Sequence, residues 1–78
     1  MNWFKRTIIP EPSAENFFES GLRKGLSDKD YAGAVNDLTE AIKDNSCNGN
    51  AYFHRGLFKR NLSDYEGSEA DLTKAIEF

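Results

Sequence analysis

A six-residue motif occurs twice in this chain of 78 residues, at a separation of 34 residues. DLTEAI spans residues 37–42 and DLTKAI spans residues 71–76, so five of the six letters are identical. We call both copies the DLT motif. Recurrence at a fixed period is typical of proteins built from repeated supersecondary units. A chain of this length is one small domain, so the two copies indicate two units packed around one core.

The positions of the prolines divide the chain into two parts. Pro10 and Pro12 are the only prolines, so residues 1–12 are expected to form an irregular lead-in. The remainder contains no helix breaker stronger than glycine, and no stretch alternates apolar and polar residues as a strand would. We predict an all-α fold with four helices, over about residues 13–26, 28–44, 49–61 and 64–78.

Serine residues are the expected N-caps of these helices. A serine side chain at the N-cap accepts a hydrogen bond from a free amide in the first turn. Ser13 stands at the expected start of the first helix, and Ser63 with Glu66 has the spacing of a capping box. Ser27 with Asp30 makes a weaker start signal for the second helix.

The two units match at more positions than the DLT motif. One apolar stripe of the second helix recurs on the fourth: Tyr31, Val35, Leu38 and Ile42, then Tyr65, Leu72 and Ile76. An aromatic residue and a glycine four positions later, Phe17 and Gly21, recur at an offset of 35 residues as Tyr52 and Gly56. The first interhelical turn is therefore expected to be one residue longer than the second. We expect both glycines to permit close packing of helices.

These matches have the period and the residue types of the tetratricopeptide repeat, and residues 14–78 resemble that family. The resemblance implies two antiparallel helical hairpins, a fragment of an α-solenoid, with repeats at about 14–48 and 49–78. It also implies a non-catalytic scaffold that acts through protein–protein contact. The chain departs from the family pattern, which has leucine, tyrosine and proline at these places, at Ser20, Arg55, Lys24, Lys59 and Ser46.

The pentatricopeptide repeat has a similar helix pair and reads single-stranded RNA with one base per repeat. This chain carries a formal net charge of −3, with both signs interspersed, and has no basic stripe to hold a phosphate backbone. We therefore expect no nucleic-acid partner.

The resemblance implies that the first helix of each repeat lines a concave surface. The apolar positions expected there are Phe18, Leu22, Phe53 and Leu57, and Arg60 and Asn61 are expected at the rim. We predict that a protein or peptide segment binds in this apolar groove. The alternative is that the chain's own N-terminus or a second copy of the chain covers these residues.

Two repeats are fewer than the three that a stable array usually needs. Leu72, Ile76 and Phe78 lack a following helix to cover them, so they are candidates for self-association into a homodimer. There are two alternatives to self-association. Either the natural protein is longer, or four bulky apolar residues of the lead-in cover these side chains: Trp3, Phe4, Ile8 and Ile9. Glu69, which stands where the first repeat has Val35, is the single polar adaptation on this stripe.

The sequence contains few candidate residues for catalysis or for binding a metal ion. His54 is the only histidine and Cys47 the only cysteine, and neither has partners at the spacing of a metal site or a nucleophile–base pair. We predict no enzyme activity, no metal and no cofactor. No apolar run approaches the length of a membrane span. A cytoplasmic protein with no membrane partner is therefore expected, since a lone thiol fits a reducing compartment.

Overall fold

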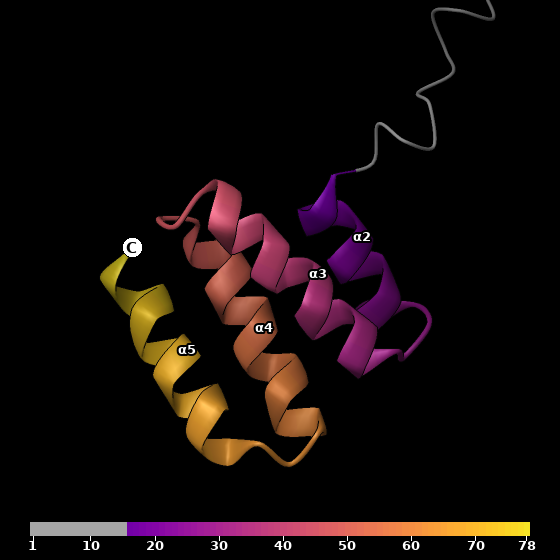
Figure 1. The fold of residues 1–78 in the computed structure, drawn as a ribbon. Coiled ribbons are helices and arrows are strands. Elements are labelled where there is room, and N and C mark those ends of the chain that lie inside the picture. Colours follow the sequence, from indigo (N-terminus) through magenta and orange to yellow (C-terminus); the bar gives the residue numbers. More distant parts are fainter. Residues whose placement is uncertain (1–15) are drawn as a thin grey trace, which may run out of the picture.

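The computed structural model describes residues 16–78, which form four helices and, within that range, no strand (Figure 1). The helices are α2 (Phe17–Leu26), α3 (Tyr31–Asp44), α4 (Gly49–Asn61) and α5 (Tyr65–Glu77). The predicted all-α fold with four helices is confirmed. The prediction that the lead-in covers the helices concerns residues outside the described range, as does the expected N-cap at Ser13.

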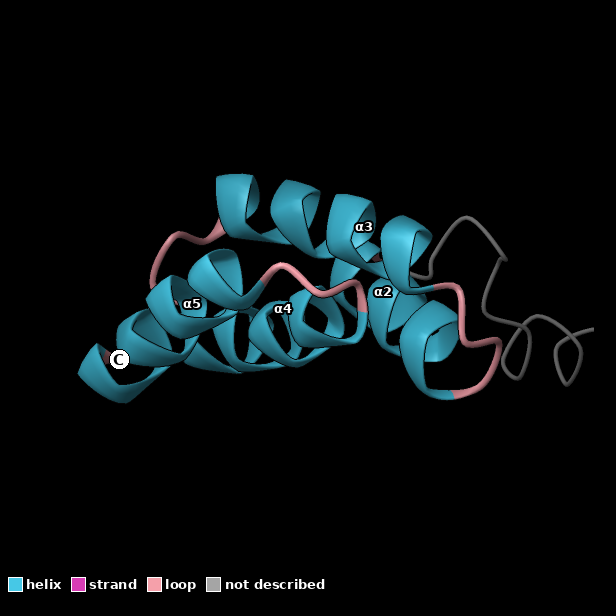
Figure 2. Ribbon diagram, turned by 90° about the horizontal axis from the view of Figure 1, so that it is seen from below, coloured by secondary structure: helices cyan, strands magenta, loops and turns pink. Residues whose placement is uncertain are grey.

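Each helix packs against the next one in the chain. Figure 2 shows α2 and α4 together on one side of α3, and α2 also makes a small contact with α4. The last helix differs from the others, because α5 packs against α4 alone among the described helices. One side of α5 therefore has no neighbour among the described helices.

Aspartate and asparagine cap the helices at their N-termini. Asp30 and Asp64 accept a hydrogen bond from the backbone N–H three residues on, at 3.0 and 2.9 Å, and thereby start α3 and α5. Asn16 caps α2, so α2 begins later than the predicted start at Ser13. The carboxylates also suit the positive end of the helix dipole.

The predictions that Ser63 and Ser27 cap the following helices are wrong. Ser63 has a φ of 67° and closes the turn between α4 and α5, so its side chain is not placed to cap. Ser27 is the C-cap of α2.

Lys29 occupies the position of Ser63 in the first turn, with a φ of 59°. The N–H of Asp30 reaches back to the carbonyl of Lys24, one residue further than the equivalent bond of the second turn. The predicted extra residue in the first turn is thus confirmed.

The buried core lies between α3 and α4. It consists of Ala34, Leu38, Ala51 and Phe58, and Phe18, Tyr31, Val35 and Ile42 pack against it. Both repeated glycines permit close packing, as predicted. A Cβ on Gly21 would lie 2.8 Å from Leu38 Cγ, and one on Gly56 would lie 3.1 Å from the same atom of Leu72.

Gly25 sets the distance between α2 and α4, and a methyl group there should destabilise the fold. A Cβ at this position would lie 2.3 Å from the ring of Phe58, whose side chain is buried among the core residues. We expect Gly25→Ala to lower the free energy of unfolding by about 1–3 kcal/mol, measured by urea denaturation.

Gly49→Ala is the matched control, since the nearest atoms to its Cβ lie at an ordinary 3.4 Å. It should leave stability unchanged or raise it by up to about 1 kcal/mol through helix propensity. Equal effects of the two substitutions would show that α2 and α4 do not approach as closely as described.

Candidate functional site

The aspartate of the DLT motif is the polar anchor of each helix pair. In the first pair, the Asp37 carboxylate accepts a hydrogen bond from Ser20 Oγ at 2.6 Å and lies 3.0 Å from Lys24 Nζ. Burial by itself would raise the pKa of Asp37. The hydrogen bonds from Ser20 and Lys24, with the positive charges of Lys24 and Arg23, outweigh it and hold the pKa below its usual value.

The second pair repeats the anchor with a stronger set of donors. The Asp71 carboxylate accepts two hydrogen bonds from Arg55, at 2.8 Å from Nε and 2.7 Å from Nη2, and lies 3.2 Å from Lys59 Nζ. This bidentate pairing is the most favourable geometry between arginine and a carboxylate. Arg55 Nη1 also donates to Thr39 Oγ1 at 3.1 Å. One guanidinium therefore connects α3, α4 and α5.

The surroundings of Asp71 favour its charged form. Only 3 % of the residue is exposed, and burial by itself would raise the pKa of its carboxyl group. The hydrogen bonds and charges of Arg55 and Lys59 outweigh burial and hold the pKa below its usual value. The hydrogen bond with Asp71 in turn raises the pKa of Arg55, against the opposing effect of burial.

The side of α5 that faces away from α4 is exposed, whereas the equivalent side of α3 is covered by α4. On α3, Tyr31, Val35 and Ile42 pack against the core. Their counterparts 34 residues on, Tyr65, Glu69 and Ile76, are all exposed, with 86 % of Ile76 accessible. We call these three residues the outer face of α5. Within residues 16–78, the repeated scaffold thus presents one covered face on α3 and one exposed face on α5.

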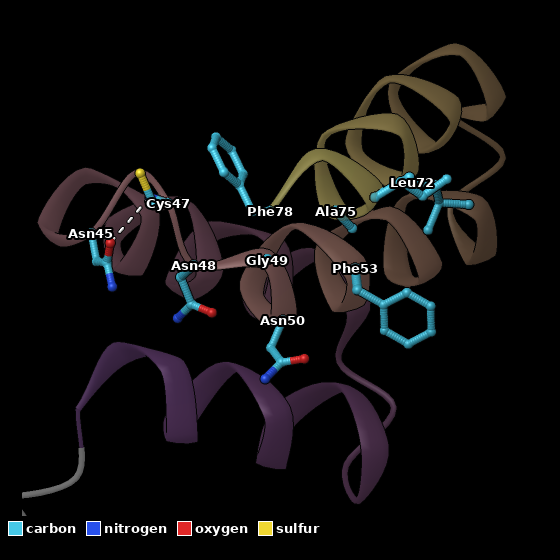
Figure 3. Close-up of a pocket in the computed structure, with 10 residues that line it drawn as sticks. Asn45, Cys47, Asn48, Gly49, Asn50, Phe53, Leu72, Ala75 and Phe78 are labelled. Carbon is cyan, nitrogen blue, oxygen red and sulfur yellow. Dashed lines mark hydrogen bonds between the residues drawn. The ribbon is translucent and has the colours of Figure 1, made fainter.

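A cavity with a volume of about 840 Å³ adjoins this face (Figure 3). Its apolar wall comes from α4 and α5, and its polar rim comes from the segment that leads into α4. The lining residues are Phe53, Leu72, Ala75, Ile76 and Phe78 with Asn45, Cys47, Asn48, Gly49 and Asn50. We call it the α5 cavity.

The first repeat has a cavity at the equivalent place, and it is much smaller. Phe18 and Ala41, the counterparts of Phe53 and Ala75, line a space of about 170 Å³ together with Asn48, the N-cap of α4. The N-cap of α4 borders this smaller space in the first repeat, whereas no helix among the described residues follows α5 at the corresponding place in the second.

The C-terminal aromatic residue forms one end of the α5 cavity. The ring of Phe78 stacks on Tyr52, with centroids 5.8 Å apart and planes inclined by 27°. Lys74 Nζ lies 5.9 Å from the Phe78 ring centroid. More than half of Phe78 nevertheless remains exposed. Its position is fixed on one side, and the other side is available for contact.

The residues predicted for partner binding fall into two groups. Phe18, Leu22 and Leu57 are half-buried, and Phe18 packs against the core. Arg60 and Asn61 are exposed, and Asn61 Nδ2 donates to the Leu57 carbonyl. Phe53 is 43 % exposed and lines the α5 cavity.

Phe53 is thus brought together with the three residues predicted for self-association, Leu72, Ile76 and Phe78. Leu72 is half-buried and approaches Gly56, whereas the other two are exposed. Sequence reasoning did not identify Asn45, Asn48, Asn50 and Ala75 as part of this surface. The polar string before α4 was the available signal, because it marks the loop that borders the cavity.

The isolated histidine and cysteine lie apart from any chemical cluster within residues 16–78. In that range no three His, Cys, Asp or Glu side chains are grouped so as to hold a metal ion. His54 lies among the rings of Phe18, Phe53 and Phe58, and its Nδ1 is 3.0 Å from the Asn50 carbonyl oxygen. From α2 to α5, no helix combines the length and the apolar character that crossing a membrane requires.

The lowered pKa of Asp71 predicts an acid-dependent loss of stability. A carboxyl group whose pKa is lower in the folded than in the unfolded state stabilises the fold above its unfolded pKa of about 3.9. That contribution disappears as the pH falls through the folded pKa. At neutral pH we expect Asp71→Asn to cost about 3 kcal/mol, the lower end of the range for breaking a buried pair, because Arg55 can still reach water.

The measurement is urea unfolding of both proteins between neutral pH and the acid limit. The difference between them should be constant at neutral pH and should shrink below about pH 3.9. Asp28→Asn removes the same charge from an exposed pair with Arg23 and should cost less than about 1 kcal/mol. A difference that does not change with pH would contradict the assignment of the stabilisation to the Asp71 carboxylate.

Comparisons of the chain with protein-family models, with curated proteins and with solved structures found no match. The resemblance to the tetratricopeptide repeat therefore rests on the residues and their period, and remains a prediction.

Proposed function

We propose that this chain is a non-catalytic protein-interaction module of two tetratricopeptide-like repeats. Its binding surface is the outer face of α5 together with the α5 cavity, and its ligand is an amphipathic helical segment of a protein. The observation that carries this proposal is the contrast between Ile42, which packs on the core, and Ile76, which is 86 % exposed at the equivalent position.

The packing of α4 on α3 indicates which kind of helix fits the outer face of α5. Ala51 and Phe58, one near each end of α4, are 0 and 2 % exposed where they meet α3. The outer face of α5 repeats the aromatic and the isoleucine of α3, so a helix with apolar residues at similar spacing fits it. The ligand class is therefore a helix that places one small and one large apolar residue two turns apart.

The α5 cavity fits the start of such a helix. At the equivalent position of the first repeat, a space of only about 170 Å³ lies beside Asn48, the N-cap of α4. The α5 cavity of about 840 Å³ leaves room for a comparable turn of helix. Burying the side chains of Ile76 and Phe78 would contribute up to about 1.5–3 kcal/mol each.

The concave side formed by α2 and α4 is the second candidate surface. Phe53, which is 43 % exposed, belongs to both surfaces. Leu22 and Leu57 offer less, because both are half-buried. The exposed, unpaired thiol of Cys47 suits a reducing, cytoplasmic setting, whichever of the two surfaces binds the ligand.

A peptide with the sequence of residues 48–62 is a direct probe, because in the protein this segment covers the equivalent face of α3. We expect its addition to shift the backbone amide NMR signals of residues 72–78 and 45–50. Ile76→Lys should abolish these shifts, because it places a charge at the centre of the apolar contact.

Ala70→Lys is the matched control, since Ala70 is exposed on α5 but lies about a third of a turn away from Ile76. It should bind the peptide as the wild type does. The absence of any shift at saturating peptide would refute the proposed function. Shifts confined to Leu22, Leu57 and Asn61 would refute the α5 surface and favour the concave side.

A further inference from the structure

We propose that the chain's own lead-in covers the outer face of α5 when no ligand is bound. The contacting residues are Trp3, Lys5 and Ile9, which lie outside the described range. The ligand helix of the proposed function then has to displace the lead-in. The inference therefore rests on that function and adds a means of regulating it.

The described chain begins close to the α5 cavity. Asn16, its first residue, lines the small cavity of the first repeat together with Asn48. Asn48 also lines the α5 cavity. Figure 1 shows the start of α2 on the same edge of the molecule as the C-terminus. The lead-in therefore joins the helices at the end of the molecule where the α5 cavity opens.

Two ring contacts connect the first turn of α2 to the wall of this cavity. The ring centroid of Phe18 lies 6.4 Å from that of His54, which lies 5.2 Å from that of Phe53. Ile9 precedes Asn16 by seven residues. A stretch of that length spans up to about 25 Å. Ile9 can therefore reach the α5 cavity without any movement of the four helices.

The lead-in and the outer face of α5 carry complementary patterns. Alternate residues of an extended segment share one side, so Trp3, Lys5 and Ile9 lie together. Ile9 directly precedes Pro10, and a proline biases the residue before it towards an extended backbone. The outer face of α5 presents an aromatic residue, an acid and an isoleucine in the same order. The two apolar ends thus match, and the charges between them are opposite.

The spacing selects one side of the lead-in over the other. The acid and the isoleucine of the outer face are seven residues apart, which is about 10.5 Å along a helix. The four residues from Lys5 to Ile9 span up to about 14 Å when extended, so they can bridge that distance. On the opposite side, the two residues from Arg6 to Ile8 span at most about 7 Å. We therefore assign the contact to the side that carries Lys5 and Ile9.

The acid of the outer face is available to a lysine. Glu69 is exposed, and no cationic side chain within residues 16–78 forms an ion pair with it. An exposed ion pair contributes little free energy by itself. Burial of Trp3 and Ile9 against apolar side chains therefore provides most of the affinity, and Lys5 fixes the register.

Cover by the lead-in weakens the apparent affinity for the ligand, because only the open molecules can bind it. If the lead-in covers the face in about nine of ten molecules, the apparent Kd is about tenfold higher than that of the open face. A partner that binds the lead-in would then release the outer face of α5.

Two adjacent isoleucines allow a test in the full chain with a matched control. Ile9→Ser removes the contact with the α5 cavity, and Ile8→Ser makes the same change on the opposite side of the lead-in. We expect the peptide of residues 48–62 to bind Ile9→Ser about tenfold more tightly than it binds the wild type or Ile8→Ser. Without peptide, the backbone amide NMR signals of residues 75–78 should move in Ile9→Ser alone.

Charge exchange tests the register with the same amide signals. Lys5→Glu and Glu69→Lys should each move the signals of residues 75–78 towards their positions in Ile9→Ser, because like charges then oppose each other. The double variant should return them towards the wild type. Arg6→Glu makes the same charge change on the opposite side and should leave them in place.

Three results would overturn the proposal. One is the same peptide affinity and the same α5 signals in the wild type, Ile8→Ser and Ile9→Ser. Another is an effect of Arg6→Glu as large as that of Lys5→Glu, which indicates a general influence of charge. The third is a set of wild-type signals that approach those of Ile9→Ser on dilution, which assigns the cover to a second copy.

The peptide separates this inference from the proposed function. A peptide that shifts the α5 signals equally in every variant refutes the cover and leaves the proposed function standing. A peptide that binds none of the variants refutes the function itself. In that case the amide signals without peptide still decide whether the lead-in covers the face.

Discussion

The buried ion pair between Asp71 and Arg55 is the interaction on which the arrangement of the last helix depends. Among the described helices, α5 has no neighbour except α4, and this pair joins the two. Arg55 also reaches Thr39, so the same guanidinium ties α5 to the first repeat. A carboxylate this deeply buried is tolerated because three donors on two cationic side chains satisfy it.

The two repeats use one scaffold for two purposes. Asp37 and Asp71 anchor their helix pairs in the same way, and the glycines opposite Leu38 and Leu72 set the same close approach. The faces differ because, within residues 16–78, α4 covers this side of α3 and no described helix covers the same side of α5. The two faces also differ in residues that the repeat does not conserve, such as Glu69 on α5. In the proposed function, the binding surface on α5 corresponds to the packing surface of α3, with Glu69 in place of Val35.

Much of the fold could be predicted from the sequence because it depends on period. The spacing of Leu38 and Leu72, the matching glycines and the unequal turns all follow from residue order along a helix. The anchors could not be predicted in that way. Arg55 and Lys59 read as departures from the family pattern, yet both contact Asp71 on the next helix. Such a pairing joins side chains of two different helices, so the spacing of residues along one helix does not predict it.

The helix caps and the α5 cavity could also be predicted only in part from the sequence. Serine and aspartate both suit an N-cap, and the choice of Asp64 over Ser63 depends on a turn that needs a positive φ.

A double-mutant cycle of Arg55→Met and Asp71→Asn tests most directly the claim that the Asp71–Arg55 pair holds the last helix in place. We predict that the losses in unfolding free energy fail to add by about 1–3 kcal/mol, because either change alone already breaks the two hydrogen bonds between Arg55 and Asp71. Losses that add within about 0.5 kcal/mol would contradict the central role of this pair.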